Sequence, residues 1–120
     1  MLRGIRGAIS IKENRKDLIE DGTERLIREM VMKNSIKAED VTSVFISVTG
    51  DVTAGFPAAA LRRLEGWKYV PVMCMQEIPV PGSLPLTIRV MAHVHTEQSQ
   101  ENIHHVYMEE AIKLRPDLSD

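Results

Sequence analysis

The sequence predicts an α+β fold in which one mixed β-sheet carries its helices on a single face. Segments in which apolar residues recur every second position alternate with segments of helical period, in the order strand, helix, strand, helix, strand, strand. Several strand segments also place polar or small side chains on their second face. A sheet covered on only one side is expected to bury its other face against copies of the same chain.

Length and composition narrow the class of protein further. The chain has 120 residues, which suits one domain over 1–120, and we expect its C-terminal tail, 115–120, to be mobile. A formal net charge of -2 argues against nucleic-acid binding, which requires a basic surface. The single cysteine, Cys74, leaves no internal disulfide. Without a secretory signal or a long apolar run, the expected compartment is the cytoplasm, with no membrane partner.

The first third of the chain combines a strand with a long amphipathic helix. Side chains alternate over 2–11, and Arg6 falls on a face of mostly small residues. Asn14 is expected to cap a helix that runs to about Asn34, because apolar residues recur there every three or four positions.

The rest of the chain is richer in strands. A β-branched strand is expected over 41–49, and a short helix begins at Pro57. Further strands are expected over 69–76 and 86–95. The stretch between them, 79–85, is rich in Pro and Gly and predicts a loop, around which these two strands are candidates for a hairpin.

Four arginines lie where a small anion could be bound. A guanidinium stays charged and presents a fixed fork of donors that matches a carboxylate. A single arginine is more often a solvated surface charge, but Arg89 lies in the middle of an otherwise hydrophobic strand. The four are Arg6, Arg62, Arg89 and Arg115.

Cys74 and Glu77 end the third strand. Three residues apart, they point to opposite faces of a regular strand, so both reach one site only if the chain bends between them. By composition alone Cys74 is a small buried residue and Glu77 an exposed strand end. A Cys–His nucleophile with His104 or His105 is an alternative that no spacing supports.

His93 and His95 share one strand face and are the best candidates for a metal pair. No third ligand has a convincing spacing, so we expect no metal and interpret them as solvated or interface histidines. The sequence also contains no phosphate-binding glycine loop and no serine nucleophile elbow.

Six short motifs together resemble the monofunctional chorismate mutases of the small trimeric type, described as a pseudo-α/β barrel. The resemblance spans nearly the whole chain, and CMQE and LRPDL in this order are its most specific parts. The motifs are RGIRGA at 3–8, FPA at 56–58, GW-Y-VPV-CMQE within 66–77, IRVM at 88–91, HVY at 105–107 and LRPDL at 114–118.

This resemblance implies a reaction and a site. The reaction is the unimolecular [3,3] rearrangement of chorismate to prephenate in phenylalanine and tyrosine biosynthesis, without metal or cofactor, between adjacent subunits of a homotrimer. The resemblance implies that Arg89 donates to the ether oxygen and a carboxylate. It also implies that Arg6 and Tyr107 hold a carboxylate, while Glu77 and Cys74 meet the ring hydroxyl. Further substrate contacts are implied for Phe56, Ala58, Met73 and Leu114 in the lining, and for Arg62 and Arg115 at the mouth.

Two departures from the family pattern stand near this site. Ala59 replaces a common lysine, and Met73 replaces a common threonine. Two other readings remain open: an imine or enamine deaminase of similar trimeric architecture, and a non-catalytic trimeric protein that binds a carboxylate ligand.

Overall fold

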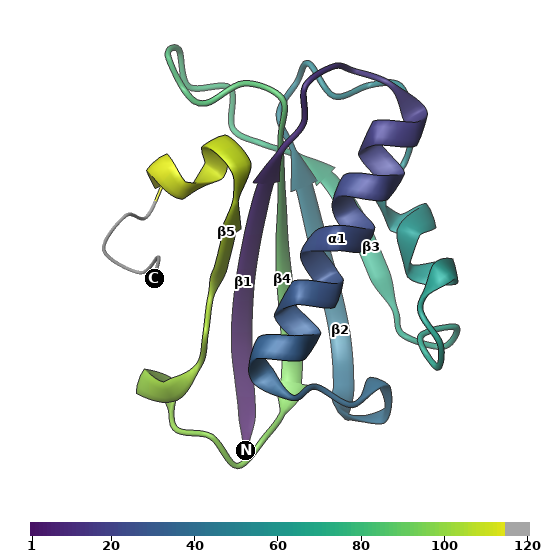
Figure 1. Cartoon of the computed structure of the whole chain (residues 1–120), viewed down its shortest axis with the longest axis vertical. Coiled ribbons are helices and arrows are strands. Elements are labelled where there is room, and N and C mark those ends of the chain that lie inside the picture. Colours follow the sequence, from purple (N-terminus) through teal and green to yellow (C-terminus); the bar gives the residue numbers. More distant parts are fainter. Residues whose placement is uncertain (115–120) are drawn as a thin grey trace.

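The computed structural model describes residues 1–114, which form one five-stranded mixed sheet with a long helix across one of its faces (Figure 1). This architecture confirms the predicted α+β class with helices on one side. The strands lie in the order β3-β2-β4-β1-β5. Their bounds are β1 (Leu2–Ser10), β2 (Val41–Val48), β3 (Val72–Gln76), β4 (Thr87–His95) and β5 (Val106–Met108), and the helix is α1 (Lys16–Asn34).

Residues 1–114 also contain four short 3-10 helices, of which the first three lie between these elements and the fourth follows β5. The second of them, η2, takes the place of the short helix predicted from Pro57, and it packs beside α1. The last, η4, follows β5 directly and lies beside the ends of β1 and β5. Their bounds are η1 (Ala38–Asp40), η2 (Pro57–Arg63), η3 (Gln100–Asn102) and η4 (Glu109–Leu114).

The strand order shows that the suggested hairpin is wrong. β3 and β4 are consecutive in sequence, but β2 lies between them, parallel to β3 and antiparallel to β4. Ten residues separate Gln76 from Thr87, enough chain to cross the end of β2. Pro71, which has no N–H to donate, precedes β3, and that strand occupies the sheet edge, where one side needs no ladder bonds.

The core lies between α1 and the sheet. The predicted amphipathic face is buried, with Ile19, Leu26 and Met30 at most 1% exposed. Gly22 is also buried, and a Cβ there would lie 3.1 Å from Cγ2 of Ile11. The close approach of helix and strand therefore explains a glycine that is unfavourable in a helix.

Asn14 does not cap α1, which corrects the sequence-based prediction. The cap residue is Arg15, and it makes no side-chain capping bond. Asn14 Oδ1 instead accepts hydrogen bonds of 2.9 Å from the backbone N–H groups of Thr53 and Ala54, and its Nδ2 donates to Thr53 Oγ1. The same amide that suits a cap therefore anchors the loop leading to η2.

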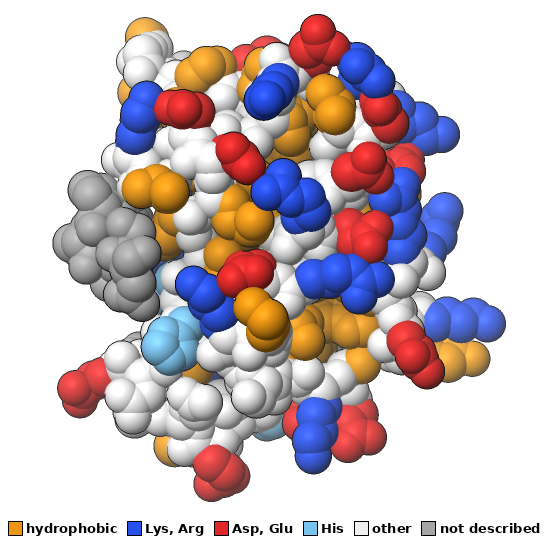
Figure 2. Space-filling view, viewed as in Figure 1, with side chains coloured by type: hydrophobic (Ala, Val, Ile, Leu, Met, Phe, Trp, Pro, Cys, Tyr) orange, Lys and Arg blue, Asp and Glu red, His pale blue; other side chains and the backbone are white. Residues whose placement is uncertain are grey.

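The outer face of α1 carries interleaved acidic and basic side chains (Figure 2). Arg63 of η2 reaches across to Glu20, Asp21 and Glu24 of α1, at N–O distances of 2.7–3.0 Å. Hydrogen bonds to these carboxylates raise the pKa of the Arg63 guanidinium. Among residues 1–114, no helix combines the length and apolar character needed to cross a membrane.

Candidate active site

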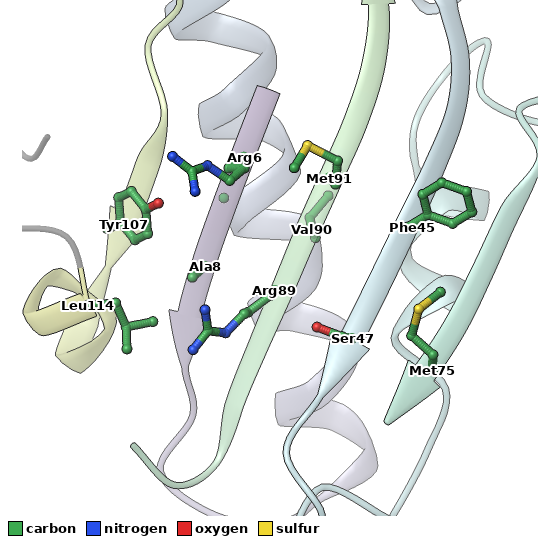
Figure 3. Close-up of a pocket in the computed structure, with 11 residues that line it drawn as sticks. Arg6, Ala8, Phe45, Ser47, Met75, Arg89, Val90, Met91, Tyr107 and Leu114 are labelled. Carbon is green, nitrogen blue, oxygen red and sulfur yellow. The ribbon is translucent and has the colours of Figure 1, made fainter. Parts of the chain in front are cut away.

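The sheet face opposite α1 carries a hollow of about 350 Å³ (Figure 3). Side chains from all five strands and from η4 enclose it, and those of Arg6 and Arg89 lie in it together with the Tyr107 phenol. Two cations and a hydroxyl suit a small anion with more than one carboxylate. The lining residues are Arg6, Gly7, Ala8, Phe45, Ser47, Met75, Arg89, Val90, Met91, Tyr107 and Leu114.

Strand register explains why the two arginines share a face. Arg89 of β4 pairs across the sheet with Ala8 of β1 on one side and with Ser47 of β2 on the other. Cross-strand partners project from the same face of a sheet. Ala8 and Arg6 are two residues apart on β1, so they also share that face. The small Ala8 side chain lies between the two guanidinium groups and leaves room above the strand.

Glu77 lies beside Arg89. Its Oε2 is 2.7 Å from Nε of Arg89 and 3.4 Å from Oγ of Ser47. Nε of Arg89 is buried and forms no well-directed hydrogen bond within residues 1–114, so the contact is an ion pair with poor N–H alignment. The two terminal nitrogens of Arg89 point into the hollow, where they are free to meet a ligand (Figure 3).

A polar clasp fixes the start of β4, three residues before Arg89. Both carboxylate oxygens of Asp51 accept from the backbone N–H of Leu86, at 3.0 and 3.1 Å. Thr49 Oγ1 accepts from the N–H of Thr87 and donates to Asp51. Leu86 has φ 49°, a left-handed conformation that is costly for a leucine. The hydrogen bonds to Asp51 and Thr49 stabilise this turn and so fix the residue at which β4 begins.

Tyr107 and Leu114 enter the hollow from the opposite edge strand and the helix that follows it. β5 pairs in parallel with β1, with Tyr107 opposite Ala8. Glu109 then adopts φ 56°, and its carboxylate lies 3.1 Å from Nη2 of Arg25 on α1. After this turn η4 lies at the β5 edge of the sheet, and the Leu114 side chain points from it into the hollow.

A second group of the predicted site residues lies elsewhere. Phe56, Ala58 and Arg62 line a separate cavity of about 650 Å³ at η2. Cys74 pairs with Ile46 in the register, so its side chain is on the α1 side of the sheet. Burial raises the pKa of its thiol, and a hydrogen bond with the backbone of Ala58 partly offsets that effect. These residues share the β3 edge of the molecule, away from the hollow.

Cys74 and Glu77 therefore point to opposite faces, as a regular strand requires, and β3 does not bend to unite them. Met73 is on the open face but does not line the hollow. A Cys–His pair within one chain is excluded, because Cys74 is on β3 and His105 adjoins β5 at the other edge. Arg115 lies outside the described residues, as does the tail expected to be mobile.

The His93 side chain contacts two residues of β2. Its Nδ1 lies 3.1 Å from Ser43 Oγ, and its ring meets Phe45 edge-on at 5.5 Å between centroids. Within residues 1–114, no three potential ligands among His, Cys, Asp and Glu are grouped for a metal.

Seven residues that line the hollow were not predicted as site residues: Gly7, Ala8, Phe45, Ser47, Met75, Val90 and Met91. For Phe45 and Ser47 the signal was available, because they occupy alternate positions of β2, out of phase with the buried Val44 and Ile46. Met75 has the same parity as Glu77, so it projects from the same face of β3. Their shared face became evident only with the strand order.

Fold and hollow together define a small α+β protein with a cationic pocket on the open face of its sheet. Residues 2–118 match the family model described as chorismate mutase type I. The chain is 47% identical over 119 residues to chorismate mutase AroH of Bacillus subtilis strain 168, covering 99% of this chain and 94% of that protein. It is 44% identical over 119 residues to chorismate mutase AroH of Thermus thermophilus, covering 98% and 97%.

The structure is similar to that of a chorismate mutase from Clostridium thermocellum, with a TM-score of 0.88 and 44% sequence identity, covering 91% of this chain and 96% of the other. This chain belongs to the type I chorismate mutase family.

Proposed function

We propose that this protein is a chorismate mutase that converts chorismate to prephenate by a unimolecular [3,3] rearrangement in phenylalanine and tyrosine biosynthesis. The observation that carries the proposal is the hollow on the open sheet face, in which Arg6, Arg89 and Tyr107 converge beside Glu77. Chorismate carries two carboxylates, an ether oxygen and a ring hydroxyl, and these four residues provide a partner for each kind of group. We place the reaction in the cytoplasm, as expected from the sequence.

Arg89 is the proposed catalytic cation. As the C–O bond of chorismate stretches, negative charge gathers on the ether oxygen and positive charge on the ring. A cation fixed at that oxygen stabilises the transition state more than bound chorismate, and only such a difference raises the turnover rate. Glu77 holds one side of the Arg89 guanidinium and leaves its terminal nitrogens directed into the hollow.

Arg6 and Tyr107 are the proposed carboxylate-binding pair, and the Glu77 carboxylate is proposed to lie near the ring as the ring becomes electron-poor. Held by these groups, the flexible enolpyruvyl side chain stays folded over the ring, which reduces the entropy lost on the way to the transition state. Leu114 is proposed to close the apolar side of the pocket.

The site is proposed to be completed by a neighbouring subunit of a homotrimer. Three predicted site residues lie at the β3 edge, outside the hollow of their own chain: Phe56, Ala58 and Cys74. The open face also exposes large apolar side chains, with Met73 62%, Met75 43% and Phe45 40% exposed. If the β3 edge of one subunit packs against the open face of the next, both groups meet in one pocket, and Met73 and Arg62 border it.

Incubation of the purified protein with chorismate tests the proposal. Loss of the ultraviolet absorbance of chorismate, with prephenate identified by chromatography, is the expected result. A protein that binds chorismate without turnover would instead be a carboxylate-binding module. Turnover of imines or enamines with no effect on chorismate would favour the deaminase reading and overturn the proposal.

A further inference from the structure

His105 makes an unusual contact within the sheet. β5 pairs with β1 only from Gly7 opposite Val106 onward. One residue earlier, the backbone N–H of Arg6 donates to Nδ1 of the His105 imidazole at 2.9 Å, and not to a backbone carbonyl. The side chain thus takes the place of a ladder acceptor at the point where β5 joins the sheet. Since the backbone N–H is the donor, Nδ1 carries no proton, so the ring is neutral, with its proton on Nε2.

The adjoining residue is fixed from the other layer. Asn34, at the end of α1, is 5% exposed, and its side chain makes two hydrogen bonds of 2.8 Å with the backbone of His104. The entry into β5 is therefore held by α1 through Asn34 and by β1 through His105. Tyr107 follows two residues later, opposite Ala8.

We infer that His105 is a positioning residue, whose Nδ1 bond to the Arg6 backbone sets the spacing between the Arg6 guanidinium and the Tyr107 phenol. This inference rests on the proposed function, in which those two groups hold one substrate carboxylate. The bond ties the strand that carries Arg6 to the strand that carries Tyr107 immediately beside both side chains. Both lie in the hollow on the same side of β1 (Figure 3).

The kinetic consequence follows from what the pair binds. A carboxylate is held equally in bound chorismate and in the transition state, so a misplaced Arg6–Tyr107 pair weakens both. Loss of the His105 bond should therefore raise KM by about tenfold, the effect of weakening one charge-assisted hydrogen bond to the substrate carboxylate, while kcat changes little.

Three substitutions separate the hydrogen bond from the shape of the side chain. In the His105→Asn variant, the asparagine Oδ1 is three bonds from Cα, as Nδ1 is in histidine. It can therefore accept the same hydrogen bond from the backbone N–H of Arg6. His105→Leu has nearly the same shape as Asn and no acceptor, and His105→Gln places its acceptor one bond too far. We expect near-normal KM for Asn and a raised KM for Leu and Gln. The control is His104→Asn, because His104 is exposed and its contacts with Asn34 are made by its backbone.

A second measurement does not depend on turnover. In the ¹⁵N spectrum of the intact protein, His105 should show the tautomer protonated at Nε2, and the Arg6 amide should exchange slowly with solvent. That protection should be lost in the Leu variant and kept in the Asn variant. If the wild-type protein shows these signals but does not convert chorismate, the proposed function is wrong, although the hydrogen bond between Arg6 and His105 is present.

A KM in the Leu variant equal to the wild-type value would overturn the positioning role. Equal damage in the Asn and Leu variants, both folded, would also overturn it, since the acceptor would then not matter. If the Leu variant does not fold, the comparison of Asn with Gln decides in the same way.

Discussion

At the scale of single residues, the open sheet face brings Glu77 and Arg89 into contact, but it leaves Nε of Arg89 without a well-directed hydrogen bond. Glu77 lies 2.7 Å from Nε of Arg89, yet that N–H is not aimed at the carboxylate. The pair lies at the rim of the hollow, where the Arg89 side chain is 43% exposed, so solvent screens its energy. We therefore expect the Glu77–Arg89 pair to contribute mainly by orienting the guanidinium, and little to the stability of the fold.

The first prediction concerns the charge of Arg89. Arg89→Ala should lower kcat by about 10²–10³, the loss typical of one oxyanion donor. Arg89→Lys should also be poor, because one ammonium cannot span the ether oxygen and a carboxylate as a fork does. Stopped-flow or steady-state assays with chorismate measure both, with Arg15→Ala, an exposed arginine paired with Glu13 and Asp17, as the control.

Citrulline at position 89 sharpens this test, because it keeps the shape of arginine and removes the charge. Near-normal kcat in that variant would mean that positioning of the substrate, and not charge stabilisation, carries the catalysis.

The second prediction concerns the Cys74 thiol, whose pKa burial raises above the ordinary value. At neutral pH the group should be a protonated thiol, so it is a weak nucleophile and a hydrogen-bond donor. Its alkylation rate by iodoacetamide should keep rising with pH beyond the point at which glutathione levels off. The linked stability has the matching sign: the folded state holds the proton more tightly, so stability is lost as pH rises through the folded pKa. A rate that levels off below the glutathione midpoint would contradict the assignment.

At the scale of elements, η2 carries two adjacent arginines with different surroundings. Arg63 is paired with three carboxylates of α1, whereas Arg62 is exposed at the rim of the cavity containing Phe56 and Ala58. One arginine attaches the element to the helix, and the other faces the proposed entrance of the site.

The third prediction uses these neighbours as matched controls for each other. Arg62→Ala should raise KM by about two- to fivefold, the effect of one screened surface charge, and more at low salt. Its urea midpoint should not change. Arg63→Ala should lower the urea midpoint, because its ties to α1 are lost, and the loss should be smaller in high salt. Equal kinetic effects of the two substitutions would show that Arg62 has no special place at the site.

At the scale of the whole molecule, the proposed function unites the two groups of predicted site residues only through an assembly of subunits. The fourth prediction is a homotrimer whose mass by light scattering is three times the 13.5 kDa of one chain. Mixed trimers give the sharper test. Arg89→Ala disables the hollow, and Ala58→Glu repels a dianion from the β3 edge, so each variant alone should be nearly inactive. After co-refolding, some interfaces combine two intact halves, and activity should reappear.

Activity of the mixture that only equals the sum of the two variants would place the whole site within one chain. An active monomer at micromolar concentration would do the same. Circular dichroism of each single variant checks that it is folded before mixing.

Local sequence patterns were sufficient to predict most of the helices and strands and the importance of Arg89. Arg89 is conspicuous in the sequence because a charged side chain interrupts an apolar, alternating strand, and in the structure it lines the hollow. Asn14 was misassigned, because its amide can satisfy a helix end or a loop 39 residues away with similar geometry. The hairpin failed for a related reason: a loop of ten residues permits both an adjacent and a crossed-over strand.

The α+β class, the side-chain alternation of the strands that carry Arg6 and Arg89, and the family are all predictable from the sequence alone, because hydrophobic period and motif order are properties of the local chain. The order β3-β2-β4-β1-β5, and with it which side chains share a pocket, depends on the tertiary structure. It brought Arg6, Arg89, Glu77 and Tyr107 together and left Cys74 on the other face. The physical reason is that side-chain direction is set by the backbone within a few residues, whereas neighbourhood is set by pairing between strands distant in sequence.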